Sequence, residues 1–146
     1  TDYSLKKIAI PADLVNPYKD YSAISLNVYK EDFAPYAKGV YTSTFFEDEW
    51  EQVLEYSPML DTYRFSDLYV SEYDFFFTWD GGSTMTLKTT DTATGYVHPS
   101  YGMVTARAVA TLYDPSTDTM KFQYNWIVSA GSFGAYIESF VITERY

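Results

Sequence analysis

The sequence has no cysteine, a single histidine, and no apolar run near the roughly 18 residues that a membrane-spanning helix requires. Without cysteine there are no disulfides, no thiolate metal sites and no cysteine nucleophile. His98 stands alone, so a metal site built from several histidines is excluded. No nucleotide-binding or catalytic signature is present either. We therefore expect no cofactor, no metal and no catalytic residues.

Positive charge is scarce as well. Ten Lys and Arg oppose twenty Asp and Glu, which gives a formal net charge of −10 at pH 7. A phosphate backbone or an anionic membrane face is bound by basic surface, so neither is an expected partner. Residues 47–80 hold ten of the carboxylates and one cation, Arg64.

Aromatic residues are abundant at 20% of the chain, and they fall into short segments that alternate apolar and polar side chains. This period of two is typical of half-buried strands. For residues 50–56, WEQVLEY, a helix is the main alternative, because Trp50, Val53 and Leu54 also fit helical spacing; we favour a strand. The other segments predicted to be strands outside the hairpins described next are 4–11, 23–30, 38–46, 63–69 and the end of the segment 129–145, after a turn at 131–134.

The most aromatic stretch is YDFFFTWDGG, residues 73–82. Side chains alternate across a strand, so its aromatics at odd positions share one face, which we expect to line the core. Phe76 falls on the other face, where a second packing layer or a ligand would explain it. The turn at 80–82 and the following STMTLKT predict a hairpin. The aromatics at odd positions are Tyr73, Phe75, Phe77 and Trp79.

A second hairpin is predicted around the loop 114–118. Even positions from Val104 to Leu112 are mostly small, and even positions from Phe122 to Val128 are bulky. Small and bulky rows on paired strands fill an interior without overpacking, so we expect both rows to be buried.

Together these patterns predict an all-β fold, an antiparallel meander of about 8–10 strands with little helix, closed as a barrel or a two-sheet sandwich to protect its edges. We expect one domain over residues 1–146. Residues 36–146 form its main body, and residues 1–35 are either an N-terminal strand pair or the tail of a preceding domain.

Candidate ligand-binding residues are the aromatic residues that do not fit the alternation of core-facing side chains or that lie in loops. The histidine is added because it would supply a polar contact. Loops at a sheet end are where barrels and sandwiches bind ligands, and TGYVHPSYG is such a segment. Aromatic faces stack on sugar rings. The candidates are Tyr69, Phe76, Tyr96, His98 and Tyr101.

The acidic corner Glu47-Asp48-Glu49, with Glu51 and Glu55, offers the carboxylate pairs of a glycoside hydrolase. Catalysis also requires one acid whose pKa is raised by an apolar pocket, and nothing in the sequence places one there. We expect these acids to be solvated.

Several phrases resemble a β-rich C-terminal domain of exported lipoproteins from gut Bacteroidetes: KGVYTSTFF, TYRFSDLY, SYGMVTA and VSAGSFGAYIESF. The resemblance covers about residues 36–142. It implies a lipid-anchored protein of the periplasm or outer-membrane surface, often encoded with glycan-uptake systems, and offers no catalytic residues to carry over. The chain begins with Thr1, and we expect that an upstream segment was removed.

The resulting expectation is a non-enzymatic binding or accessory module of the cell envelope, with a glycan or another envelope protein as partner. The alternative is a structural or protein-interaction spacer without a small-molecule ligand. A hydrolase using the acidic corner is a third hypothesis. A small apolar ligand inside a closed barrel is a fourth, which the bulky row from Phe122 to Val128 disfavours.

Overall fold

The computed structural model describes residues 32–87 and 90–146, and the contacts among them define a unit from Phe33 to Tyr146. The strands predicted at 4–11 and 23–30 lie outside the described residues. Within the described part there are nine strands and no helix. The strands are β1 (Ala34–Ser43), β2 (Asp48–Ser57), β3 (Thr62–Phe65), β4 (Phe75–Trp79), β5 (Met85–Leu87), β6 (Asp91–His98), β7 (Gly102–Asp114), β8 (Thr119–Val128) and β9 (Gly131–Arg145).

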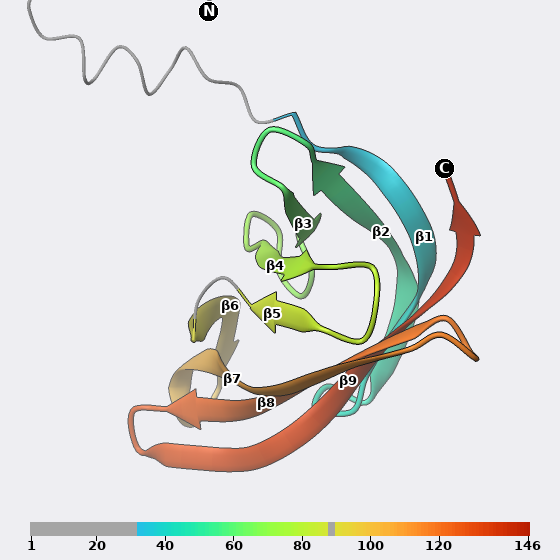
Figure 1. The fold of residues 1–146 in the computed structure, drawn as a ribbon. Coiled ribbons are helices and arrows are strands. Elements are labelled where there is room, and N and C mark those ends of the chain that lie inside the picture. The colour runs from blue at the N-terminus through green and yellow to red at the C-terminus, as the bar shows by residue number, and fades with distance from the viewer. Residues whose placement is uncertain (1–31, 88–89) are drawn as a thin grey trace, which may run out of the picture. The chain divides into compact units, whose positions relative to one another are not determined.

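All neighbouring strands are antiparallel, in the order β5-β4-β3-β2-β1-β9-β8-β7-β6. Two meanders, β1–β5 and β6–β9, are thus joined along β1 and β9, and the sheet curls into a half-barrel (Figure 1). Its two arms meet where β5 approaches β7. There the Thr111 hydroxyl donates to the Met85 carbonyl over 2.6 Å, and the rings of Trp79 and Tyr113 lie 4.9 Å apart. The predicted all-β antiparallel fold is confirmed, as a single curled sheet.

The alternation predicted for β8 is confirmed along its whole length. Phe122, Tyr124, Trp126 and Val128 are all buried, and the residues between them are half-buried. The neighbouring half of β7 supplies the small partners, with Ala106 paired to Trp126 and Ala108 paired to Tyr124.

The prediction for the second half of β7 is wrong. The register of β7 on β8 shifts between Ala108 and Ala110, so Val109 is an extra residue on the β7 side. A bulge of this kind inverts which positions face inward. Leu112 is therefore 50% exposed, and Tyr113 is buried in its place.

The aromatic run 73–79 divides as its alternation predicted. Phe75 and Phe77 of β4 are fully buried, whereas Tyr73 and Trp79 at the two ends of the run are half-buried. Phe76 lies on the opposite face of β4. The hairpin with β5 is confirmed by the pairs Phe77 with Leu87 and Trp79 with Met85.

Residues 50–56 are confirmed as a strand within β2, and the helical alternative is wrong. Pairing with both β1 and β3 gives this segment backbone partners on each side, which a helix would forgo. Leu54 is its deepest residue and is fully buried.

The concave side of the half-barrel is filled by large side chains. Burying each of them stabilises the fold by roughly 1.5–3 kcal/mol relative to exposure, so the interior is a packed core rather than a ligand chamber. The largest fully buried apolar side chains are Trp126, Tyr41, Phe65, Phe75, Phe77, Phe122, Phe140, Leu54 and Met120.

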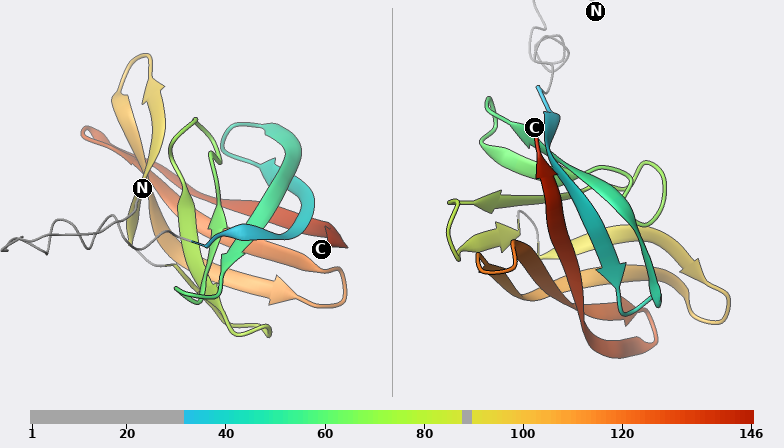
Figure 2. Two further views of the ribbon diagram at one scale, coloured as in Figure 1. Left: turned by 90° about the horizontal axis from the view of Figure 1, so that it is seen from above. Right: turned by 90° about the vertical axis from the view of Figure 1, so that its right-hand side faces the viewer.

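The two ends of the half-barrel differ in what connects the strands there. At one end, here called the mouth, lie the connections 44–47, 66–74, 99–101 and 129–130, gathered along the upper edge of the left view in Figure 2. At the opposite end, here called the far end, lie the connections 58–61, 80–84 and 115–118. The mouth contains most of the predicted ligand-binding residues.

Candidate ligand-binding site

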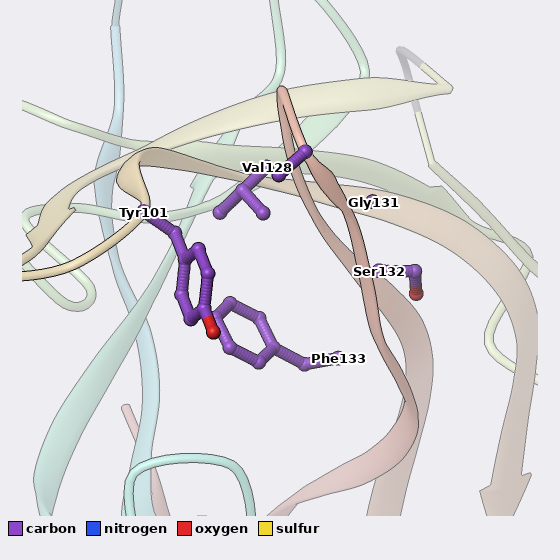
Figure 3. A pocket seen from close by; sticks show the side chains of 6 residues that line it. Tyr101, Val128, Gly131, Ser132 and Phe133 are labelled. Atoms are coloured by element: carbon purple, nitrogen blue, oxygen red, sulfur yellow. The ribbon is translucent and has the colours of Figure 1, made fainter.

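The first hollow at the mouth, here called the Tyr101 cavity, has a volume of about 240 Å³ and lies between the β6–β7 turn and the β8–β9 turn. Tyr101 is 51% exposed, and its ring centroid lies 5.7 Å from that of Phe133. Figure 3 shows both rings beside the hollow, with Val128 above them. Gly131 adds backbone without a side chain to the wall.

His98, at the end of β6, packs against both rings of this cavity. Its ring centroid lies 5.1 Å from Tyr101 and 5.2 Å from Phe133. The backbone N–H of Ser100 donates to Nδ1 of His98 over 3.0 Å. In the neutral ring the proton therefore resides on Nε2, which is left to donate a hydrogen bond.

A second hollow of about 240 Å³, here called the Trp50 cavity, lies between the β1–β2 turn and the loop 66–74. It continues the aromatic surface, because the Phe46 ring lies 5.0 Å from Tyr96, and Tyr96 lies 6.2 Å from His98 of the first hollow. Its lining is Phe46, Asp48, Trp50, Tyr69, Val70 and Tyr96.

One buried carboxylate organises the mouth. Glu138 of β9 is fully buried, and its Oε2 accepts hydrogen bonds from the backbone N–H groups of Thr44 at 3.0 Å and Phe45 at 3.3 Å. Its Oε1 accepts the phenol hydrogen of Tyr69 at 2.7 Å. These bonds lie where β1 ends at Ser43 and fix the turn that carries Phe46, one wall of the Trp50 cavity, so residues 44–46 do not continue the strand predicted there.

The hydrogen bonds continue behind Tyr69. Since its only hydroxyl hydrogen goes to Glu138, the hydroxyl of Tyr41 donates to the Tyr69 oxygen. Burial raises the pKa of Tyr41 and of Tyr69, which keeps both phenols protonated as donors. Burial also raises the pKa of the Glu138 carboxyl above its ordinary value of 4.5, and the hydrogen bonds it accepts oppose that rise.

The charge at the mouth is negative. Asp48 lines the Trp50 cavity, and among the described residues its carboxylate accepts a hydrogen bond only from the backbone N–H of Glu49, at 2.8 Å. None of the basic side chains in the described part of the chain lines either cavity. These side chains are Lys38, Arg64, Arg107, Lys121 and Arg145.

Four of the five residues predicted to bind ligand meet at the mouth. Tyr101 and His98 belong to the Tyr101 cavity, and Tyr69 and Tyr96 line the Trp50 cavity. Phe76 does not join them. On the outer face of β4 its ring lies 6.0 Å from that of Phe33, so a second packing layer accounts for it.

The sequence reasoning missed other residues of the site. Phe133 carries a weak signal, as an aromatic among the glycines of GSFG. For Phe46 and Trp50 the sequence predicts only a position in a strand and no role in ligand binding. Glu138 gives no signal at all, because a lone acid within IESF resembles any solvated strand residue until the turn that it caps is folded over it.

The acidic corner does not assemble a desolvated carboxylate pair in the described structure. Glu47, Asp48, Glu49 and Glu51 are exposed, and Glu55 accepts a 2.7 Å hydrogen bond from the Arg64 guanidinium. Among the described residues no group of three or more His, Asp or Glu side chains is placed to hold a metal ion.

Comparison with known proteins finds no matching family model, no similar curated protein and no similar solved structure. Within residues 32–87 and 90–146 no helix has the length and apolar character needed to cross a membrane.

Proposed function

We propose that this chain is a non-enzymatic binding module that holds a saccharide at its mouth, accessory to nutrient capture at a bacterial cell envelope. The saccharide ring stacks in the Tyr101 cavity, and the ligand extends along the aromatic surface toward Tyr96. The envelope location is supported by the short motifs that resemble exported lipoproteins of gut Bacteroidetes.

The observation that carries this proposal is the exposure of an aromatic ring within a built cavity. Tyr101 is half exposed, yet its ring packs against the rings of His98 and Phe133, which also contact each other. A flat ring fixed in this way loses little conformational freedom when a sugar stacks on it. Nε2 of His98 supplies a polar atom beside the cavity for a sugar hydroxyl.

A binding role is favoured over hydrolysis by the placement of the acids. A glycoside hydrolase needs two carboxylates about 5–10 Å apart across the bond to be cleaved, one of them protonated near neutral pH. The desolvated acid of the mouth is Glu138, and Tyr69 together with the β1–β2 turn occupies both of its oxygens.

The test is a glycan array followed by calorimetry on the positive glycans, using the full chain and the variant Tyr101→Ala. We expect the affinity to fall at least tenfold, the equivalent of about 1.4 kcal/mol. Met103→Ala is the matched control, because Met103 is 52% exposed on the outer face of the same hairpin. Equal losses in both variants, or no glycan bound by the full chain, would contradict the proposal.

A second candidate function is protein interaction. β6 is an edge strand of eight residues, and the cross-strand pair Val97 and Met103 exposes apolar surface beside it. Exposed edges and apolar patches are features of docking surfaces. If no glycan binds, this candidate function replaces the first.

A further inference from the structure

The Trp50 cavity differs in shape from a sugar-stacking platform. The planes of Phe46 and Tyr96 meet at 87°, and those of Trp50 and Tyr69 at 82°, with centroids 5.0 and 6.0 Å apart. Rings at such steep angles form the walls of a box rather than one flat surface. A volume of about 240 Å³ lies below the roughly 300–1,000 Å³ of sites for drug-sized ligands. The box therefore fits a compact group.

The electrostatics of this box favour a cation. The π-face of each aromatic ring is negative, and a cation within about 6 Å of the ring centroid is attracted to it. Asp48 adds a full negative charge at the cavity. Behind the Tyr69 wall, the phenol donates to Glu138, which polarises the ring further toward negative charge.

Carboxylates also pair with cations beside aromatic residues elsewhere in this fold. At the far end, the guanidinium of Arg145 binds the carboxylate of Asp118 and lies within hydrogen-bonding reach of Tyr36 and Tyr113. Likewise, the Arg64 guanidinium lies 4.1 Å from the centre of the Phe33 ring. A carboxylate thus pairs with a cation at both places, and at Arg64 an aromatic ring contacts the cation as well.

The Trp50 cavity has the same components but no cation from the described part of the chain. Arg64 pairs with Glu55, Arg107 with Asp91 and Arg145 with Asp118. Lys38 lies 3.6 Å from both Glu51 and Glu144. The fifth basic residue, Lys121, is exposed on β8 between Met120 and Phe122 and does not line the cavity.

We propose that the Trp50 cavity is a receptor for an alkylated ammonium group, such as the trimethylammonium head of choline. The methyl groups pack against the walls formed by Phe46, Trp50, Tyr69 and Tyr96, and the positive charge faces Asp48. The group is held without hydrogen bonds, which a quaternary nitrogen cannot donate. This site is separate from the Tyr101 cavity and does not depend on saccharide binding there.

The test compares a cation with its uncharged isostere. Choline, tetramethylammonium and 3,3-dimethylbutan-1-ol, in which carbon replaces the nitrogen of choline, are titrated into the full chain by calorimetry, with indole NMR shifts reporting the site. We expect both cations to bind at least tenfold more tightly than the alcohol. Equal affinity for choline and the alcohol would show an apolar hollow only and would overturn the proposal. Failure of both cations to bind would overturn it as well.

Two variants locate the site. Asp48→Asn changes one exposed side chain without removing bulk, so the fold is retained, and we expect weaker binding of choline with unchanged binding of the alcohol. Trp50→Leu removes a wall and should abolish binding of both. Tyr101→Ala is the control and should leave choline binding unchanged, whatever its effect on saccharides. If Asp48→Asn and Trp50→Leu both bind choline like the unsubstituted chain, the proposed site is wrong.

Discussion

The two ends of the half-barrel are both rich in aromatic rings, yet they treat charge in opposite ways. At the far end the guanidinium of Arg145 donates two hydrogen bonds to the Asp118 carboxylate, and the Tyr113 phenol donates a third at 2.6 Å. At the mouth Asp48 has no basic partner among the described residues, and Glu138 accepts hydrogen bonds from uncharged donors.

This difference shows that aromatic content does not by itself mark a binding site. The rings of Tyr36 and Tyr63 at the far end are 5.3 Å apart, about as close as Phe46 and Tyr96 at the mouth. The two ends differ in one pairing: Asp118 at the far end has a cationic partner, whereas Asp48 at the mouth has none among the described residues, and the Tyr101 ring there is half exposed.

The largest effect is expected from removing the buried acceptor of the mouth. Glu138→Ala leaves the donors of Thr44, Phe45 and Tyr69 without a partner, and we expect the free energy of unfolding to fall by about 3–5 kcal/mol. Asp118→Ala is the matched change at the far end, where water can replace the lost partner but Ala must adopt a φ of 55°, so the loss should be about 2 kcal/mol. Urea denaturation measures both, and losses of similar size would remove the distinction between the ends.

A smaller effect is expected from adding one methyl group on the mouth side. Gly95 has a φ of 80°, and a Cβ there would lie 2.5 Å from the Tyr73 ring, so Gly95→Ala should destabilise the fold by about 2–3 kcal/mol. Gly81 in the β4–β5 turn has a φ of 86° with open space around it. Gly81→Ala should therefore cost only the backbone strain, about 1 kcal/mol, in the same thermal or urea unfolding measurement.

The smallest and most specific effect is a difference in the sign of pH dependence. Burial raises the pKa of Glu138 above 4.5, so its contribution to stability is present below pH 4.5 and is lost as the pH rises through the raised value. Hydrogen bonds from Arg145 lower the pKa of Asp118 below 3.8, so its contribution is present above pH 3.8 and is lost as the pH falls through the lowered value.

Urea unfolding of Glu138→Gln and Asp118→Asn from about pH 3 to about pH 8 measures these contributions as differences from the unsubstituted chain. With rising pH, the stability of the unsubstituted chain should fall relative to Glu138→Gln and rise relative to Asp118→Asn. Two differences of the same sign would mean that the ends do not differ electrostatically.

The sequence predicts those parts of the fold that depend on local alternation. β8 and the hairpin of β4 and β5 follow their period of two, because the extra residues that shift register against β8 lie on β7 and β9 and leave β8 itself regular. Leu112 was misplaced because one extra residue, Val109, inverts the rest of β7, and nothing in the sequence AVATLY distinguishes a bulge from a regular strand.

For the site, the sequence identifies which residues have side chains suited to binding, but not which of them lie close together in the fold. Tyr96, His98 and Tyr101 were found because they lie within one hairpin, where spacing in the sequence is spacing in the structure. The partnership of Glu138 with Thr44 spans 94 residues and depends on the strand order, which a single sequence does not reveal.

The position of β9 between β1 and β8 has a consequence for how the chain is made. β9 is central in the sheet but follows the other eight described strands in the sequence, so until residues 131–145 emerge from the ribosome the two meanders cannot join and two sheet edges remain unpaired. Such edges template association between chains. A chain that stops before residue 131 should therefore yield aggregated protein rather than a smaller soluble domain.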